Sequence, residues 1–95
     1  MLIRVVTLDS KAGMEEQLRE MGRDVLIPIN KESGSMNAYF LEPSAEDDNL
    51  SFGVVSIWSD KETLDTMKNS ERYLTLIQNM SPLIKSLTDR LYLTR

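Results

Sequence analysis

The stretch SFGVVSIWSDKETLDTMKNSERY, residues 51–73, decides the fold of this chain. Side chains alternate between two faces over residues 50–58, which predicts a strand that ends at Trp58, the single tryptophan of the sequence. Ser59 is followed three residues later by Glu62, the pairing of a capping box, so we expect a helix to begin there. Ser70 is a second capping residue. The stretch therefore predicts a strand, a helix, a break and a second helix.

The sequence before this stretch predicts two strands and one helix. Residues 2–8 are short and rich in β-branched side chains, which favours a strand. Residues 14–29 predict a helix whose apolar stripe consists of Met14, Leu18, Met21, Val25 and Ile29. Pro28 disfavours helical geometry at Ile27, so we expect the helix to kink or stop there and residues 30–34 to form a connection. Residues 35–42 alternate as a second strand, and the acidic residues 43–49 predict an exposed hairpin loop.

The sequence after this stretch predicts a long helix and a last strand. Apolar side chains continue at helical spacing after Ser70, and they are Tyr73, Leu74, Ile77, Met80, Ile84 and Leu87. Pro82 should bend this helix. Residues 89–95 predict a strand. The order β-α-β-β-α-β is that of the ferredoxin-like α+β fold, a four-stranded antiparallel sheet with helices on one face, and residues 1–95 are expected to form one such domain.

Composition excludes several classes of function. The chain has no histidine and no cysteine, so a Ser-His or Cys-His nucleophile and a conventional zinc site are impossible. Its net charge of -4 disfavours nucleic acid as a partner. The first residues do not read as a signal peptide and no apolar run could span a bilayer, so we expect a cytoplasmic protein with no membrane partner. The acidic residues Glu46, Asp47 and Asp48 lack the spacing of a calcium loop, and we interpret them as a solvated loop.

The predicted sheet is apolar on both faces. Residues 2–8 and 50–58 both place apolar side chains on both sides, whereas a sheet face in water should be polar at every second position. At about 25 cal/mol per Å² of apolar surface, a wet apolar face would cost several kcal/mol. We therefore expect a homodimer in which two copies pack through the sheet faces that carry no helices; the alternative is a monomer with an exposed apolar patch.

Three parts of the sequence resemble the antibiotic biosynthesis monooxygenase (ABM) domain family: GSMNAYFLE at residues 34–42, the stretch 51–73, and the proline-bent helix that follows. The resemblance covers nearly the whole chain, and its most specific residues are Trp58, Ser59, Glu62, Leu64, Ser70 and Tyr73. It implies a dimeric α+β barrel with a pocket between helices and sheet in each subunit. Some members oxygenate aromatic polyketides without metal or flavin, some related proteins degrade haem, and many have no established activity.

The resemblance does not extend to haem degradation. The haem-degrading relatives have an asparagine on the first strand, a tryptophan on the helix after the third strand, and an axial histidine. The corresponding places in this sequence hold Val6, Met67 and Ile77. We therefore expect no haem-degrading activity, and no cofactor or metal is expected.

Five residues are candidates for a substrate-binding pocket: Trp58, Asn37, Tyr73, Met67 and Arg4. Trp58 could stack on a planar substrate, or it could close the end of the core with its indole nitrogen hydrogen-bonded. Tyr73 could hydrogen-bond a ligand, or it could be a half-buried ring with a wet hydroxyl. Asn37 and Arg4 could point into a cavity, or they could be exposed or paired between subunits. Met67 could form an adaptable pocket wall, or it could fill a gap in the core.

Two hypotheses on function follow. The first is a cofactor-independent monooxygenase of a small aromatic molecule, quinol-like or polyketide-like, in which the substrate's own anion activates oxygen and the protein shapes and dries the pocket. The second is a non-catalytic dimeric module that binds a small ligand or regulates a partner. An open, partly polar cavity between helices and sheet favours the first, and a narrow cavity favours the second.

Overall fold

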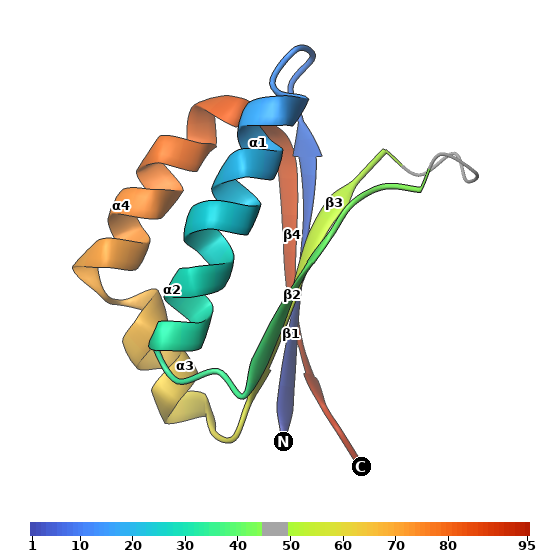
Figure 1. The fold of residues 1–95 in the computed structure, drawn as a ribbon. Coiled ribbons are helices and arrows are strands. Elements are labelled where there is room, and N and C mark those ends of the chain that lie inside the picture. The colour runs from blue at the N-terminus through green and yellow to red at the C-terminus, as the bar shows by residue number, and fades with distance from the viewer. Residues whose placement is uncertain (45–49) are drawn as a thin grey trace.

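The chain folds into one antiparallel sheet covered by helices on one face (Figure 1). The computed structural model describes residues 1–44 and 50–95, so the predicted loop at residues 43–49, with Glu46, Asp47 and Asp48, lies largely outside the described residues. The strands are β1 (Leu2–Ser10), β2 (Asn37–Leu41), β3 (Phe52–Trp58) and β4 (Ile84–Leu93), in the order β2-β3-β1-β4. This is the predicted ferredoxin-like topology.

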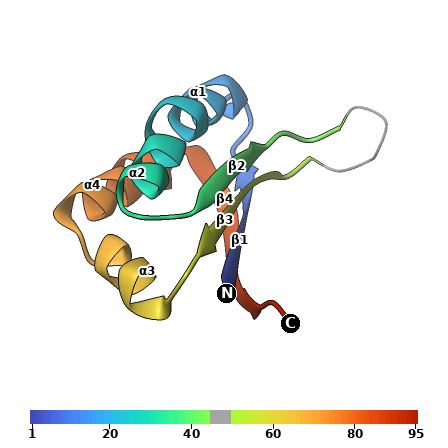
Figure 2. The same ribbon diagram turned by 60° about the horizontal axis from the view of Figure 1, so that its bottom comes forward.

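The helices form a single layer, which Figure 2 shows from a second direction. In chain order they are α1 (Glu15–Met21), the π-helical turn η1 (Gly22–Leu26), α2 (Ile27–Glu32), α3 (Lys61–Lys68), α4 (Glu71–Met80) and the 3-10 turn η2 (Ser81–Leu83). Within the described residues, no helix has the length and apolar character needed to cross a bilayer.

The register of the sheet decides which side chains face the helices. Arg4 on β1 is paired with Ser56 on β3 and with Leu91 on β4. Directly paired residues point to the same side of a sheet, and Arg4 and Ser56 are both buried, so this side is the one that the helices cover. Asp89 also points to this side, because its partner on β1 is the buried Val6.

The first helix continues past the position where we expected it to stop. It changes to a π turn over Gly22–Leu26, where the amide of Ile27 donates to the carbonyl of Gly22, and then runs on as α2 to Glu32. The prediction that residues 30–34 form a connection is therefore wrong for residues 30–32. The irregular turn lies directly before Pro28, which has no amide proton and whose ring would press on the carbonyl four residues earlier in a regular helix.

The π turn also changes which side chains face the sheet. A regular helix turns by about 100° per residue, so Val25 would lie almost directly above Leu18 and face the core with it. The extra residue of a π turn rotates everything after it. Val25 is accordingly 39% exposed, while Leu26 is 6% and Asn30 only 1% exposed. Val25 was wrongly placed in the predicted apolar stripe, and Asn30 is brought into the interior instead.

The caps of the later helices are partly as predicted. Asp60, and not Ser59, caps α3: its carboxylate accepts from the amide of Thr63 at 2.7 Å, whereas the Ser59 hydroxyl only donates to Asp60. Asp60 is the residue in extended geometry directly before the helix, which is where a cap must lie. Ser70 caps α4 as expected, since its hydroxyl accepts from the amide of Tyr73.

The last strand begins earlier than predicted. The helix that was expected to continue through Pro82 ends at Met80, and Ile84 and Leu87 belong to β4 instead. Pro82 cannot continue the helical hydrogen bonding, and β1 offers partners over its whole length, from Leu2 paired with Leu93 to Ser10 paired with Ile84. Leu74, placed in the predicted stripe, is 51% exposed, and Leu76 is buried in its stead.

Candidate functional site

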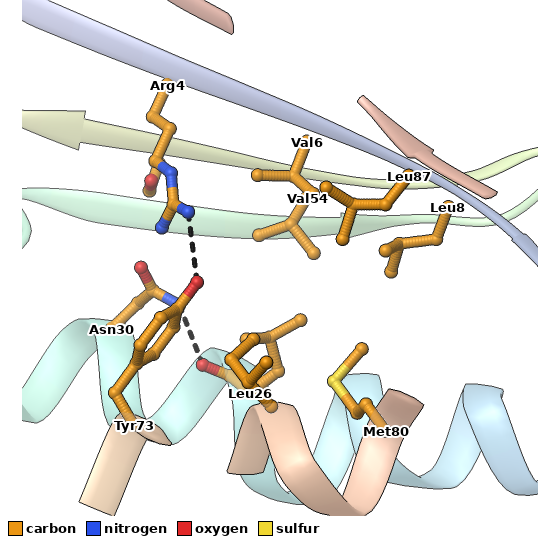
Figure 3. Close-up of a pocket in the computed structure, with 11 residues that line it drawn as sticks. Arg4, Val6, Leu8, Leu26, Asn30, Val54, Tyr73, Met80 and Leu87 are labelled. Carbon is orange, nitrogen blue, oxygen red and sulfur yellow. Dashed lines mark hydrogen bonds between the residues drawn. The ribbon is translucent and has the colours of Figure 1, made fainter. Parts of the chain in front are cut away.

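A small cavity lies between the sheet and the helices α2 and α4, and Figure 3 shows its lining. Its volume of about 20 Å³ leaves room for about one water molecule. Its polar lining residues are Arg4, Asn30, Ser56 and Tyr73, and its apolar ones are Val6, Leu8, Leu26, Val54, Ile77, Met80 and Leu87. The polar groups of Arg4, Asn30 and Tyr73 gather at one end and Leu8, Met80 and Leu87 lie at the other.

Arg4 provides a buried and neutralised positive charge at the polar end. Its Nε donates to Asp89 Oδ1 at 3.0 Å and its Nη2 donates to Asp89 Oδ2 at 2.7 Å, so the two groups form a bidentate ion pair. Burial alone lowers the pKa of Arg4, but the hydrogen bonds with Asp89 and Tyr73 outweigh it, and the pKa is raised overall. The hydrogen bond from Arg4 lowers the pKa of Asp89. Both groups are therefore charged near neutral pH, and their charges cancel.

Tyr73 connects this ion pair to the cavity. Its position at the start of α4 is fixed by the Ser70 cap, which holds its amide. The guanidinium of Arg4 lies 5.6 Å above the centre of the Tyr73 ring, and Nη2 donates to the Tyr73 hydroxyl at 2.9 Å. Among the hydrogen bonds of the described residues the Tyr73 hydroxyl acts only as an acceptor. Its own proton is therefore available to a ligand in the cavity.

Asn30 contributes an acceptor that has no partner. Its amide nitrogen donates to the carbonyl of Leu26 at 2.8 Å, which fixes the orientation of the side chain. Its Oδ1 is buried and has no hydrogen-bond partner within the described part of the chain. Sequence reasoning missed Asn30 because the expected break at Ile27 placed it in a connection, and nothing in the sequence signals the π turn that turns it inward.

Ser56 and Trp58 support the wall of the cavity from β3. The indole Nε1 of Trp58 donates to the Ser56 hydroxyl at 2.9 Å, and both side chains are fully buried. Ser56 lines the cavity, but Trp58 does not and belongs to the hydrophobic core. Of the two interpretations given for Trp58, the structure matches the second: its side chain closes the core, and its indole nitrogen has a hydrogen-bond partner.

The structure brings together two of the five predicted pocket residues, Arg4 and Tyr73. Met67 is 1% exposed in the core and does not line the cavity. Asn37 lies on the sheet face away from the helices, because it is paired with Ile57, and its amide donates to the Tyr39 hydroxyl at 2.7 Å. Of the residues at the haem-site places, Val6 and Ile77 line the cavity and present only apolar atoms to it.

The described residues offer no set of metal ligands. Across residues 1–44 and 50–95, no three acidic side chains gather in a geometry that could hold a metal ion. Asp9, a lone acidic group, instead accepts from the hydroxyls of Ser51 and Ser86, which lowers its pKa. The chemistry of the cavity is that of a guanidinium, a phenol, an amide and a hydroxyl.

Comparisons with known proteins place the fold. No protein-family model and no curated protein matches the sequence. Solved structures do match. An antibiotic biosynthesis monooxygenase has a TM-score of 0.83 at 15% identity, with 100% of this chain and 99% of that chain covered. A variant of SnoaB, a cofactor-independent oxygenase from Streptomyces nogalater, has a TM-score of 0.79 at 15% identity, with 99% and 92% covered.

A third solved structure, PA3566 from Pseudomonas aeruginosa, has a TM-score of 0.83 at 19% identity, covering 99% of this chain and 93% of that chain. At such identities a structural likeness establishes the fold, and function needs separate support. The agreement extends over the whole length of the chain in each case. This chain has the fold of the antibiotic biosynthesis monooxygenase domains.

Proposed function

We propose that this chain is a monooxygenase that acts on a small electron-rich aromatic molecule without metal or flavin. The observation that carries the proposal is the cavity between helices and sheet, apolar over most of its lining and ended by the Arg4, Tyr73 and Asn30 groups. In its lining, though not in its volume, this cavity matches the usual form of a small-molecule site, which is mostly apolar with a few fixed polar groups. The structural likeness to a cofactor-independent oxygenase and to an antibiotic biosynthesis monooxygenase points to the same chemistry.

In this proposal the substrate supplies the electrons. A ring carbon of an anthrone-like substrate loses two hydrogen atoms and gains a carbonyl oxygen from O2, and the second oxygen atom leaves as water. The protein orients the substrate and excludes bulk water. The proton of Tyr73 is free to bind an oxygen of the substrate, and this hydrogen bond stabilises negative charge that develops on that oxygen during the reaction.

The size of the cavity requires the apolar end to open. About 20 Å³ is far less than an aromatic ring occupies, so ligand entry needs side-chain movement. Met80 has three rotatable bonds and Leu87 is 44% exposed, so we expect the opening to involve these two side chains at the apolar end.

The test is oxygen uptake with a panel of hydroquinones and anthrones. Tyr73→Phe removes the hydroxyl while keeping the ring, and we expect the rate to fall by about tenfold to a hundredfold. Tyr92→Phe is the matched control, because Tyr92 is half exposed on the sheet face away from the helices, and its rate should equal that of the unmodified protein. No uptake above the uncatalysed rate with any of these compounds would refute the proposal.

A second candidate function is a non-catalytic module that binds a small ligand or regulates a partner. The narrowness of the cavity favours it, since a site that turns over an aromatic molecule must open and close in every cycle. The same panel separates the two: an aromatic compound that binds without oxygen uptake supports the ligand-binding module.

We also propose that the chain forms a homodimer through the sheet face that carries no helices. Residues of this face include Ile3, Val5, Val55 and Ile57, which the register places side by side on β1 and β3. Together with the half-exposed Tyr39 and Tyr92, they make an apolar surface suited to packing against a second sheet. A second copy offers the same surface, so the two can meet around a twofold axis.

Sedimentation at micromolar concentration tests the dimer. We expect a particle of twice the chain mass, which Val55→Glu should convert to a monomer because Val55 is paired with Val5 and Tyr39 in the sheet, so the variant buries two carboxylates that have no cation directly beside them. Leu74→Glu is the control, since Leu74 is an equally apolar residue exposed on α4, and this variant should remain dimeric. A monomer of the unmodified protein under these conditions would contradict the proposal.

A further inference from the structure

The cavity contains an acceptor and a donor that the described protein groups do not satisfy. Asn30 Oδ1 is buried without a partner, and the Tyr73 hydroxyl has a proton without an acceptor. Buried polar atoms without partners are rare in folded proteins, because each one loses its hydrogen bonds to water and gains none in return. These two groups line the same cavity and lie at its same end (Figure 3).

The orientation of Asn30 is a built feature of the helix. The π turn of Gly22–Leu26 rotates the following residues so that Asn30 is buried and lines the cavity, and the bond from its amide nitrogen to the carbonyl of Leu26 fixes the orientation of its amide group. A regular helix would have turned Asn30 away from the sheet. Turns of this kind occur frequently at functional sites.

The charge at this end decides against an anionic ligand. Arg4 is the cation that would attract a carboxylate, but both oxygens of Asp89 already accept from it. A ligand carboxylate would therefore bring an unbalanced charge into a buried site and would place further acceptors against Asn30 Oδ1. Two hydrogen-bond acceptors in contact repel each other, and burial of an unpaired charge costs free energy of binding.

We propose that the polar end of the cavity selects an uncharged hydroxyl group on an aromatic ligand. The hydroxyl donates to Asn30 Oδ1 and accepts from the Tyr73 hydroxyl, so that both unsatisfied groups gain a partner. This rests on the proposed function insofar as it needs the cavity to admit a small aromatic molecule. It goes further by naming Asn30 as the residue that distinguishes a phenol from an ether or a carboxylate of the same size.

Three probes of similar size test the selection: phenol, anisole and benzoate, titrated against the protein by calorimetry at pH 7 without oxygen turnover. At this pH phenol is uncharged and both donates and accepts, anisole only accepts, and benzoate is an anion that only accepts. We expect phenol to bind about tenfold or more tightly than either of the others, because each of them leaves Asn30 Oδ1 unpaired.

Two variants assign the selection to Asn30. Asn30→Leu removes the acceptor with little change of volume, and we expect phenol and anisole to bind it with equal affinity. Ser35→Ala is the matched control: the Ser35 hydroxyl is also buried without a hydrogen-bond partner among the described residues, but Ser35 does not line the cavity, so the preference for phenol should persist. The comparison of probes on the unmodified protein does not depend on either variant being folded.

Equal affinity of the unmodified protein for phenol and anisole would overturn the proposal, and so would tighter binding of benzoate. Failure of all three probes to bind, with a single ordered water between Asn30 and Tyr73 in a crystal structure, would also overturn it. The proposed oxygenase activity is tested separately. If phenol is preferred but no substrate gives oxygen uptake, the activity is refuted and the selection of a hydroxyl group stands.

Discussion

The ion pair between Arg4 and Asp89 shows how strongly the stability of the fold can depend on one side chain. Their ion pair is the most buried of those found among the described residues, with the Arg4 side chain 7% and the Asp89 side chain 32% exposed. Removal of one partner of such a pair leaves the other charge in a poorly solvated site. Arg4 is the more deeply buried partner, so the loss of stability is largest when its charge is left without a counter-ion. Asp89 is therefore the informative residue to substitute.

Asp89→Ala should lower the free energy of unfolding by about 2–4 kcal/mol, measured by denaturant titration, because Arg4 remains buried without its counter-ion. Arg4→Met together with Asp89→Ala should recover most of this loss. Asp65→Ala is the control, since Asp65 pairs with Lys61 on the surface of α3, and it should cost about 0.5 kcal/mol or less. A small effect of Asp89→Ala would mean that water reaches the guanidinium.

The candidate site could be predicted from the sequence only where a residue faces the interior in a regular element. Arg4 alternates with apolar neighbours on a strand, and Tyr73 follows a recognisable cap, and both of these predicted residues line the cavity. Asn37 was placed on the wrong face of the sheet. Alternation shows that a strand has two faces, but it does not show which of them the helices cover. Asn30 was missed because a π turn has no sequence signature comparable to a capping residue.

At the scale of elements, the π turn packs closely against β2 where Gly22 meets Phe40. A Cβ added at Gly22 would lie 2.2 Å from Cε1 of Phe40, far inside van der Waals contact. The helix can therefore keep this close approach with a larger residue at position 22 only if the Phe40 ring shifts. The approach holds the π turn, and the residues that it rotates inward, against the sheet.

Gly22→Ala should destabilise the protein by about 1–3 kcal/mol, although helix propensity alone predicts a gain of about 1 kcal/mol. The sign of the change in unfolding free energy is therefore diagnostic, and it can be read from thermal or denaturant unfolding. Phe40→Leu in the same chain should relieve part of the clash. A stabilising Gly22→Ala would show that Phe40 moves aside freely.

The helices and strands were predictable where the residues at their ends, such as capping residues, indicate where the element begins or ends. The succession of strands and helices along the chain followed from the periodicity of apolar side chains, and the Ser70 cap followed from a hydroxyl at the right spacing. The start of α3 was misplaced by one residue because Ser59 and Asp60 are both capping residues, and backbone geometry chose Asp60. The start of β4 was missed because Ile84 and Leu87 fit a helical spacing, and only the pairing with β1 makes them a strand.

At the scale of the whole molecule, stability should depend on acidity through depressed carboxyl pKa values. The hydrogen bond from Arg4 lowers the pKa of Asp89 below its ordinary value of 3.8. A carboxyl group whose pKa is lower in the folded than in the unfolded protein stabilises the fold above the unfolded pKa, and this contribution is lost as pH falls through the folded pKa.

We therefore expect the free energy of unfolding to be nearly constant around neutral pH and to decline below about pH 4. The decline should be less steep in Asp89→Asn, which has no carboxyl group to protonate at this site. Asp9 and Asp60 also have lowered pKa values, so the difference between the two proteins, measured at each pH, isolates the contribution of Asp89. Parallel profiles would indicate that Asp89 does not contribute to this dependence.

Because Asp89 already balances Arg4, a neutral ligand that enters the cavity displaces no counter-ion and meets no net field. Ionic strength should then leave its affinity unchanged between dilute buffer and molar salt, whereas a site that attracted anions with a free guanidinium would weaken as salt screens it. The molecule would thus recognise its ligand equally well in brine and in fresh water.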